Sequence, residues 1–134
     1  MARFSELPAL LSYLVEAAQG MTGETLLRAS LAVEELFTNS IHHGYGGESD
    51  RPVWLAVECL PAGLRIHYAD AASPFDPLTG DPAGLVGDDH VTRRVGGLGR
   101  VLIRDMAQAS RYRYADGRNE VTLDYLSSDN ARPS

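Results

Sequence analysis

The sequence contains no lysine, since all 12 of its basic residues are arginines. A phosphate-binding P-loop needs a lysine that reaches the β- and γ-phosphates, so that kind of nucleotide site is excluded. A lysine nucleophile and the strand lysine of protein kinases are excluded for the same reason. Any phosphate clamp in this chain must therefore use arginine, backbone N–H groups or a metal ion.

Cysteine, long apolar runs and positive net charge are also scarce or missing. The single cysteine, Cys59, cannot form an internal disulfide, which favours a reducing, cytoplasmic location. No apolar run approaches the roughly 20 residues that span a bilayer. The N-terminus has no secretory signal pattern, so we expect no membrane partner. The net charge of −6 argues against direct binding to nucleic acid.

Length and periodicity fit one domain with a mixed fold. The 134 residues, 44% of them hydrophobic, suit a single core, which we place at residues 1–126, with 127–134 as a frayed tail. Helical spacing of apolar residues predicts helices over 7–18, 22–43 and 96–109. Alternation predicts strands over 53–60, 64–70, 112–115 and 120–126, with a hairpin turn at Asp116-Gly117. The predicted fold class is α+β: a two-layer sandwich of an antiparallel or mixed sheet with helices on one face.

The second predicted helix carries a carboxylate and an amide on one face. Glu35 and Asn39 are four residues apart, so their side chains lie one helical turn from each other. Oxygen ligands of this kind suit Mg²⁺, and Asn39 can coordinate the ion while Glu35 acts as a general base. The alternative is a pair of solvated surface residues, and the short pattern taken alone favours that alternative.

Two further segments point to nucleotide chemistry. Asp70 ends a predicted strand and enters a loop rich in proline and glycine, where its carboxylate can accept the exocyclic amine of adenine. The alternative for Asp70 is a turn cap. The run from Arg93 to Arg100 is a glycine-rich loop that leads into a helix. Its backbone N–H groups, together with Arg93 and Arg94, can bind phosphate, or the loop can be a plain hinge.

The order of these three segments resembles the GHKL ATP-binding superfamily, and specifically the RsbW-like anti-sigma-factor serine kinases of bacterial partner switching. The resemblance covers roughly Leu7 to Tyr125. Residues 35–45, 70–77 and 96–103 are similar to the N, G1 and G2 boxes of the family, and 116–123 to its closing hairpin.

The resemblance implies a Bergerat-type sandwich that holds ATP between the helices and the sheet, under the long loop as a lid. Asn39 would then hold Mg²⁺, and Glu35 would be the catalytic base. Asp70, helped by Thr122, would recognise the adenine amine. The other cofactor-binding residues expected are His43, Ala72, Phe75, Arg94, Gly97, Leu98 and Gly99. A contact between Arg94 and the γ-phosphate is our own inference.

The resemblance also implies a function: an ATP-binding anti-sigma regulatory factor with serine/threonine kinase activity toward an anti-sigma-factor antagonist. A sigma factor is the second expected partner. The alternative is a non-catalytic, ATP-sensing module that sequesters a partner. Ala72 favours this alternative, because the family has glycine there and a Cβ can crowd the adenine or block a positive φ. Only five residues precede the first helix, too few for the usual first strand of the family, which leaves homodimerisation open.

Arginine is concentrated late in the chain. Seven arginines lie between Arg93 and Arg118. They can face an acidic protein partner or form a solvated surface, and the sequence favours neither reading.

Overall fold

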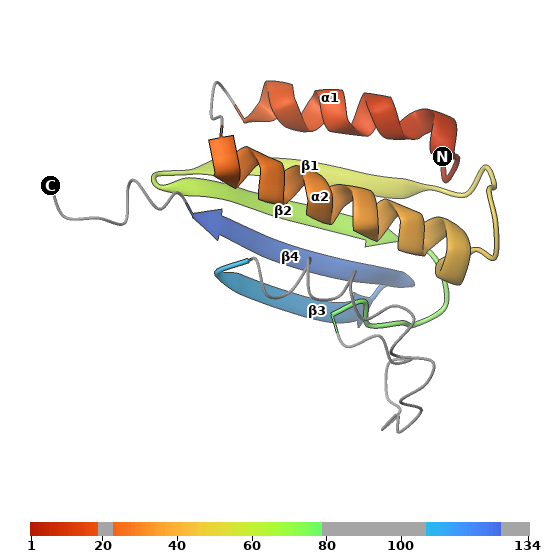
Figure 1. Ribbon diagram of the computed structural model, residues 1–134. Coiled ribbons are helices and arrows are strands. Elements are labelled where there is room, and N and C mark those ends of the chain that lie inside the picture. The colour runs from red at the N-terminus through yellow and green to blue at the C-terminus, as the bar shows by residue number, and fades with distance from the viewer. Residues whose placement is uncertain (19–22, 79–106, 127–134) are drawn as a thin grey trace, which may run out of the picture.

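The computed structural model describes residues 1–18, 23–78 and 107–126. Its elements are η1 (Phe4–Glu6), α1 (Leu7–Ala17), α2 (Gly23–Asn39), η2 (Ser40–Gly44), β1 (Val53–Leu60), β2 (Gly63–Asp70), β3 (Ala109–Ala115) and β4 (Arg118–Leu126). The strands form one antiparallel sheet in the order β1-β2-β4-β3. Figure 1 shows α1 and α2 side by side on the same face of this sheet. The predicted α+β sandwich with helices on one face is confirmed.

The core lies between the helices and the sheet and follows from two periodicities. On α2 the buried apolar residues recur at helical spacing: Ala29, Ala32, Val33, Leu36 and Phe37. On β2 and β4 every second side chain faces them: Leu64, Ile66, Tyr68, Val121, Leu123 and Tyr125. Removal of this apolar surface from water stabilises the two layers against each other. The odd-numbered residues of β4 therefore face the helices, and the even-numbered residues face away.

The end of α2 differs from the sequence prediction of a helix that runs unbroken to about His43. The α-helix ends at Asn39, and Ser40–Gly44 continue as one π-helical turn. Its wider spacing is visible in the bond from the Tyr45 N–H to the Ser40 carbonyl, which is 2.8 Å long and spans five residues. Turns of this kind are common at functional sites. Here the turn leaves Ser40 buried beneath the loop that follows β2.

The β3–β4 hairpin is confirmed, including its turn. Asp116 and Gly117 have φ values of 55° and 76°, as a two-residue turn with both central residues left-handed requires. The predicted end of the third helix is wrong, because Ala109 opens β3 opposite Asp124. The rest of that predicted helix, the loop beyond residue 78 and the predicted tail at 127–134 lie outside the described residues.

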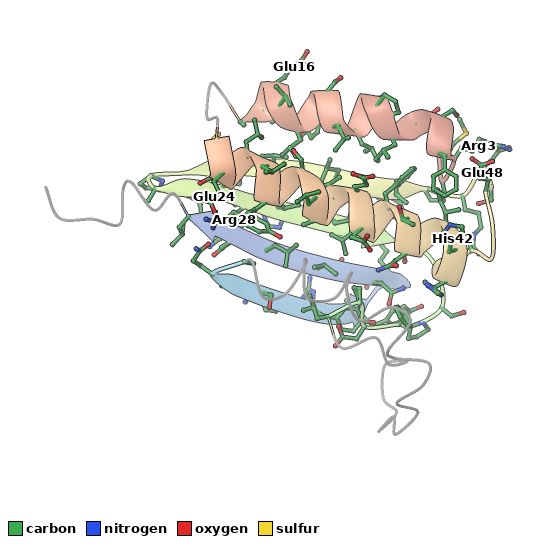
Figure 2. All side chains as sticks on the ribbon, viewed as in Figure 1. Arg3, Glu16, Glu24, Arg28, His42 and Glu48 are labelled. Carbon is green, nitrogen blue, oxygen red and sulfur yellow. The ribbon has the colours of Figure 1, made fainter. Side chains whose placement is uncertain are left out.

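The chain start is held against the segment that leads into β1. Ala2 is fully buried, and its N–H donates to the Arg51 carbonyl over 2.9 Å. The Phe4 N–H donates to Glu48 over 2.7 Å, and Figure 2 shows Arg3 and Glu48 close together at the start of α1. Within the three described ranges, no helix is long and apolar enough to cross a membrane.

Candidate functional site

A cleft lies between the C-terminal end of α2 and the adjoining ends of β2 and β4. From α2 and its π-helical turn it is lined by Leu36, Asn39, Ser40 and Gly44. From the sheet it is lined by Tyr68, Asp70, Asn119 and Val121, and from the loop after β2 by Ala72, Phe75 and Pro77. The structure thus brings together two of the segments singled out in the sequence, the Glu35–Asn39 helix end and the Asp70 loop.

Asp70 is the buried carboxylate of this cleft, with 8% of its surface exposed. Its Oδ2 accepts a 2.6 Å hydrogen bond from the Ser40 hydroxyl. Its Oδ1 accepts from the Ala72 N–H at 3.1 Å and from the Asn119 amide at 2.9 Å. A carboxylate offers about four acceptor positions, so roughly one remains for an incoming donor. This arrangement suits recognition of a single amine.

Ser40 and Tyr68 extend the network away from Asp70. The Tyr68 hydroxyl lies 2.8 Å from the Ser40 oxygen. Burial raises the pKa of Tyr68 well above its ordinary value, so the phenol keeps its proton. Since Ser40 gives its only hydrogen to Asp70, Tyr68 must donate to Ser40. The two hydroxyls therefore form a directed chain that fixes the orientation of the carboxylate.

Asn119 joins β4 to the loop after β2 and is 5% exposed. Besides Asp70, its NH₂ group reaches the carbonyls of Ala72 at 3.2 Å and Ser73 at 3.0 Å. Its Oδ1 accepts from the Phe75 N–H at 2.9 Å and from the Tyr112 hydroxyl at 2.6 Å. Both ends of the amide are fully used, which fixes its orientation. Asn119 thereby holds the whole turn that carries the cleft wall.

The structure does not bring Thr122 together with Asp70, although the sequence predicted that Thr122 helps Asp70 at the adenine. Asp70 pairs in register with Asn119, and both side chains face the helices. Thr122 is three residues further along β4, and an odd offset in a strand turns a side chain to the opposite face. It lines a hollow on the open side of the sheet instead. The parity of the buried residues Val121, Leu123 and Tyr125 is the sequence signal that could have identified Asn119.

Asn39 and Glu35 differ in their distance from the cleft, because only Asn39 is part of its lining. Asn39 lines it and is half-buried, while Glu35 is half-buried one turn earlier and is not part of the lining. In the part of the chain that the structure describes, no group of three His, Cys, Asp or Glu side chains could hold a metal. Mg²⁺ does not need such a cage, because it commonly takes one or two protein oxygens, water and ligand phosphates. The donor set here fits that mode of binding, with Asn39 as the protein oxygen.

The side chain of Ala72 is tightly packed, unlike that of a surface residue. Ala72 is 2% exposed, and a Cβ built on Gly44 would lie 2.9 Å from the Ala72 Cβ. Ala72 does not adopt a positive φ, because Asp116 is the one non-glycine residue that does so among the described residues. The sequence suggested two ways in which alanine at position 72 could weaken nucleotide binding, by blocking a positive φ or by crowding the adenine. Only crowding is compatible with this backbone.

Phe75 and His43 form the rim of the cleft. Their rings stack with centroids 6.1 Å apart and an interplanar angle of 19°. Phe75 lines the cleft, whereas His43 is exposed beside it. The remaining expected residues, Arg94, Gly97, Leu98 and Gly99, lie outside the described residues, so the phosphate end of the site stays a prediction.

The fold and the cleft agree with the comparison of the sequence with known families. A family model described as "Histidine kinase-like ATPase domain" matches residues 2–125, and the chain belongs to this family. Among individual proteins, the chain is similar to the serine-protein kinase RsbW of Listeria innocua serovar 6a, with 27% identity over 115 residues that cover 84% of this chain and 73% of the relative. RsbW of Listeria monocytogenes serovar 1/2a is 28% identical over the same shares. The resemblance to RsbW-like members of the GHKL superfamily is confirmed.

Proposed function

We propose that this protein is an ATP-binding anti-sigma regulator that transfers the γ-phosphoryl group of ATP to a serine or threonine of an antagonist protein. The observation that carries the proposal is the cleft in which Asn39, Asp70 and Asn119 converge, in a chain of the ATPase family. The similarity to RsbW proteins, which are named serine-protein kinases, supports the choice of reaction.

The adenine end of the site is formed by Asp70 and the groups that orient it. The exocyclic amine donates to the remaining acceptor position of the carboxylate. Ser40 and Asn119 already donate to its two oxygens, so the carboxylate does not have to reorient when the base arrives. Preorganisation of this kind lowers the entropic cost of binding.

The phosphate end is formed by Asn39 and Glu35 of α2. Bound Mg²⁺ would neutralise phosphate charge, with Asn39 as its protein ligand. Glu35, one turn earlier, accepts the proton of the attacking hydroxyl as general base. The glycine-rich turn at residues 96–99 and Arg94 complete this end. The reaction takes place in the cytoplasm, and a sigma factor is the second partner.

A second candidate function is an ATP-sensing module that sequesters a protein without phosphoryl transfer. Ala72 favours it, because its buried Cβ lines the cleft where the adenine would lie. Nucleotide would still bind under this reading, with reduced affinity, and would bias the protein toward one partner.

The test separates binding from transfer. We expect calorimetric titration to show Mg-ATP binding, and labelled ATP to transfer phosphate to a candidate antagonist. Glu35→Gln should keep ATP affinity and reduce transfer by about 10²- to 10⁴-fold, the usual contribution of a general base. Glu34→Gln, one residue earlier and exposed, is the matched control and should keep both. Retained transfer in Glu35→Gln would contradict the assigned base, and binding without any transfer would favour the ATP-sensing module.

A further inference from the structure

The face of the sheet that points away from the helices carries rows of side chains set by the strand register. One row runs across the sheet from Trp54 through Ala69 and Glu120 to Arg113. The next row runs from Ala56 through His67 and Thr122 to Arg111. Three side chains in these rows are small, Ala56, Ala69 and Thr122, whereas Trp54, Arg111 and Arg113 are large and lie on the two outer strands.

A hollow of about 620 Å³ results from this size pattern. Ala56, Ala69 and Thr122 contribute to its floor, and Trp54, Arg111 and Arg113 to its sides. Trp54 is 36% exposed although it is the largest apolar side chain of the protein. The hollow therefore combines an apolar surface with guanidinium groups, on the face of the sheet opposite the cleft.

The arginines around this hollow have donor groups to spare. The guanidinium carbon of Arg118 lies over the Trp54 ring, 3.8 Å from its centroid. Such stacking leaves the in-plane N–H groups open to an acceptor. Arg111 is exposed, and its charge acts on Asp124 without a hydrogen bond or ion pair to any described residue. Arg113 alone of the three is paired, to Glu120 at 2.6 Å.

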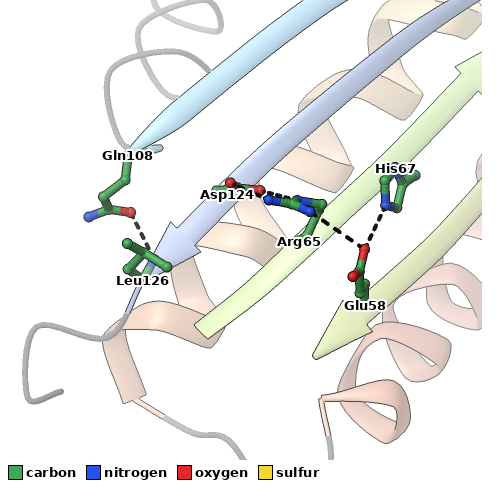
Figure 3. Close-up of polar contacts among 6 residues, drawn as sticks. All are labelled: Glu58, Arg65, His67, Gln108, Asp124 and Leu126. Atoms are coloured by element: carbon green, nitrogen blue, oxygen red, sulfur yellow. Dashed lines mark hydrogen bonds and ion pairs between the residues drawn. The ribbon is translucent and has the colours of Figure 1, made fainter. Parts of the chain in front are cut away.

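At the other end of the same face, the positive charge of Arg65 is neutralised by acidic side chains of the same sheet. Figure 3 shows Arg65 between Asp124 and Glu58, with His67 on the other side of Glu58. Arg65 donates to Asp124 over 2.7 and 3.0 Å, and Glu58 lies 3.3 Å from His67. Among the described arginines, Arg65 is thus paired with acidic side chains, whereas Arg111 and Arg118 beside the hollow form no ion pair with a described residue, in a chain whose net charge is −6. Of the seven arginines noted in the sequence, Arg111 and Arg113 line the hollow, and Arg118 lies over the ring of Trp54, which also lines it.

We propose that this hollow is a docking site for an acidic segment of a partner protein. Carboxylates of the segment accept hydrogen bonds from Arg111 and Arg118, and one apolar side chain covers Ala56 and Ala69 beside Trp54. Charge complementarity identifies the occupant, because a basic or neutral segment would leave the arginines desolvated without acceptors. The site does not depend on the proposed kinase activity, since the residues that would contact the segment, Arg111, Arg118, Ala56 and Ala69, do not line the cleft.

Trp54 is the only tryptophan, so its fluorescence reports on this hollow alone. The probe is a short synthetic peptide of aspartates and glutamates with one central leucine, titrated into the intact chain. We expect a saturable change in Trp54 emission that weakens as salt rises. Arg111→Glu should weaken affinity by about tenfold, because it replaces an attractive charge with a repulsive one. Arg3→Glu makes the same charge change at the chain start and should leave affinity within about twofold.

Four outcomes would overturn the proposal. The first is the absence of any saturable change in Trp54 emission. The second is equal binding by the counterpart peptide in which lysines replace the acidic residues. The third is an equal loss of affinity in Arg111→Glu and Arg3→Glu, which would show a general charge effect. The fourth is a dimer in sedimentation equilibrium that Arg111→Glu dissociates, which would assign the face to a second copy of the chain.

Discussion

The amide of Asn119 donates a 2.9 Å hydrogen bond to Oδ1 of Asp70, and this bond joins β4 to the end of β2 inside the cleft. The same amide holds the loop that forms the opposite wall. The residue that positions the Asp70 carboxylate therefore lies on β4, 49 residues further along the chain.

Replacement of Asn119 by alanine should weaken ATP binding by at least about tenfold. The substitution removes the hydrogen bond to the buried Asp70 and leaves the part-buried Phe75 N–H without its acceptor. Loss of a buried partner costs about 1–3 kcal/mol, so the free energy of unfolding should fall by a similar amount. Calorimetric titration with ATP and urea unfolding measure the two effects. Thr122→Ala, on the opposite face of the same strand, is the control. Equal losses of affinity in both variants would restore Thr122 as part of the site.

Gly44→Ala should destabilise the protein, and Ala72→Gly should relieve the effect. The new Cβ would lie 2.9 Å from the Ala72 Cβ, closer than two carbon atoms pack. Overpacking of this kind costs about 1–3 kcal/mol. In the double variant the two changes should be strongly non-additive, as expected for groups in direct contact. Urea unfolding of the four proteins gives the coupling energy, and additive effects would show that the two sites do not touch.

Ala72→Gly taken alone should raise ATP affinity while it lowers stability. Removal of a methyl group widens the cleft, and glycine increases the entropy of the unfolded chain by an amount worth about 0.4–1 kcal/mol. Titration with ATP and thermal unfolding follow the two changes. An unchanged affinity would mean that the Cβ of Ala72 does not crowd the base.

The ion pair of Arg65 with Asp124 should make stability depend on pH. Hydrogen bonds from Arg65 hold the pKa of Asp124 below its usual value. Because the pKa of Asp124 is lower in the folded state, ionised Asp124 stabilises the fold at pH values above its unfolded-state pKa of about 3.9. This stabilisation is lost as the pH falls through the folded-state pKa of Asp124. Asp124→Asn should therefore cost about 0.5–1 kcal/mol near neutral pH, and the difference from the parent should shrink below about pH 4.

Urea unfolding at both pH values measures this difference. Asp50→Asn is the control, because Asp50 pairs with Arg3 at the surface, where the two side chains are 73% and 43% exposed. Exposed pairs contribute little, so this variant should match the parent at either pH. A pH-independent loss in Asp124→Asn would show that packing, rather than charge, is responsible.

Asn39→Ala should weaken Mg-ATP much more than metal-free ATP. Asn39 is the oxygen ligand expected for the ion, whereas the adenine contact proposed for Asp70 does not involve it. Calorimetric titrations with Mg²⁺ and with a chelator separate the two cases. Equal weakening in both would place Asn39 in contact with the nucleotide itself.

The sequence was sufficient to predict the two-layer fold and the convergence of Asn39 with Asp70. Apolar periodicity identifies the buried faces, and the pairing of adjacent strands in hairpins limits the possible sheets. The end of α2 was less predictable, because a π-helical turn and an α-helical turn differ by one hydrogen-bond step and share the same residue preferences. The predicted helix end at Ala109 failed because the pairing of Ala109 with Asp124 in the sheet overrides the helix preference of alanine.

The role of Asn119 could not be derived from its neighbours alone. Its five acceptor and donor partners come from β2, β3 and the loop after β2, so they exist only once β4 is paired on both sides. Strand parity narrows the choice to residues on the helix side, but the register of β2 with β4 decides which one meets Asp70. Thr122 has a hydroxyl that suits the site, but the register places it on the face of the sheet that points away from the helices.

The alternation of side chains along the β3–β4 hairpin has one more consequence. Tyr112 and Asn119 face the cleft, while Arg111 and Arg113 on the same ribbon border the hollow behind it. Because both sets of side chains are attached to the same two strands, a change in the twist of the β3–β4 hairpin moves the side chains on both of its faces. If nucleotide shifts this ribbon, thermodynamic reciprocity requires that an acidic peptide on the far side change nucleotide affinity by the same factor. A titration of ATP in the presence and absence of that peptide would measure this factor, and a factor of one would mean that the ribbon is rigid to both ligands.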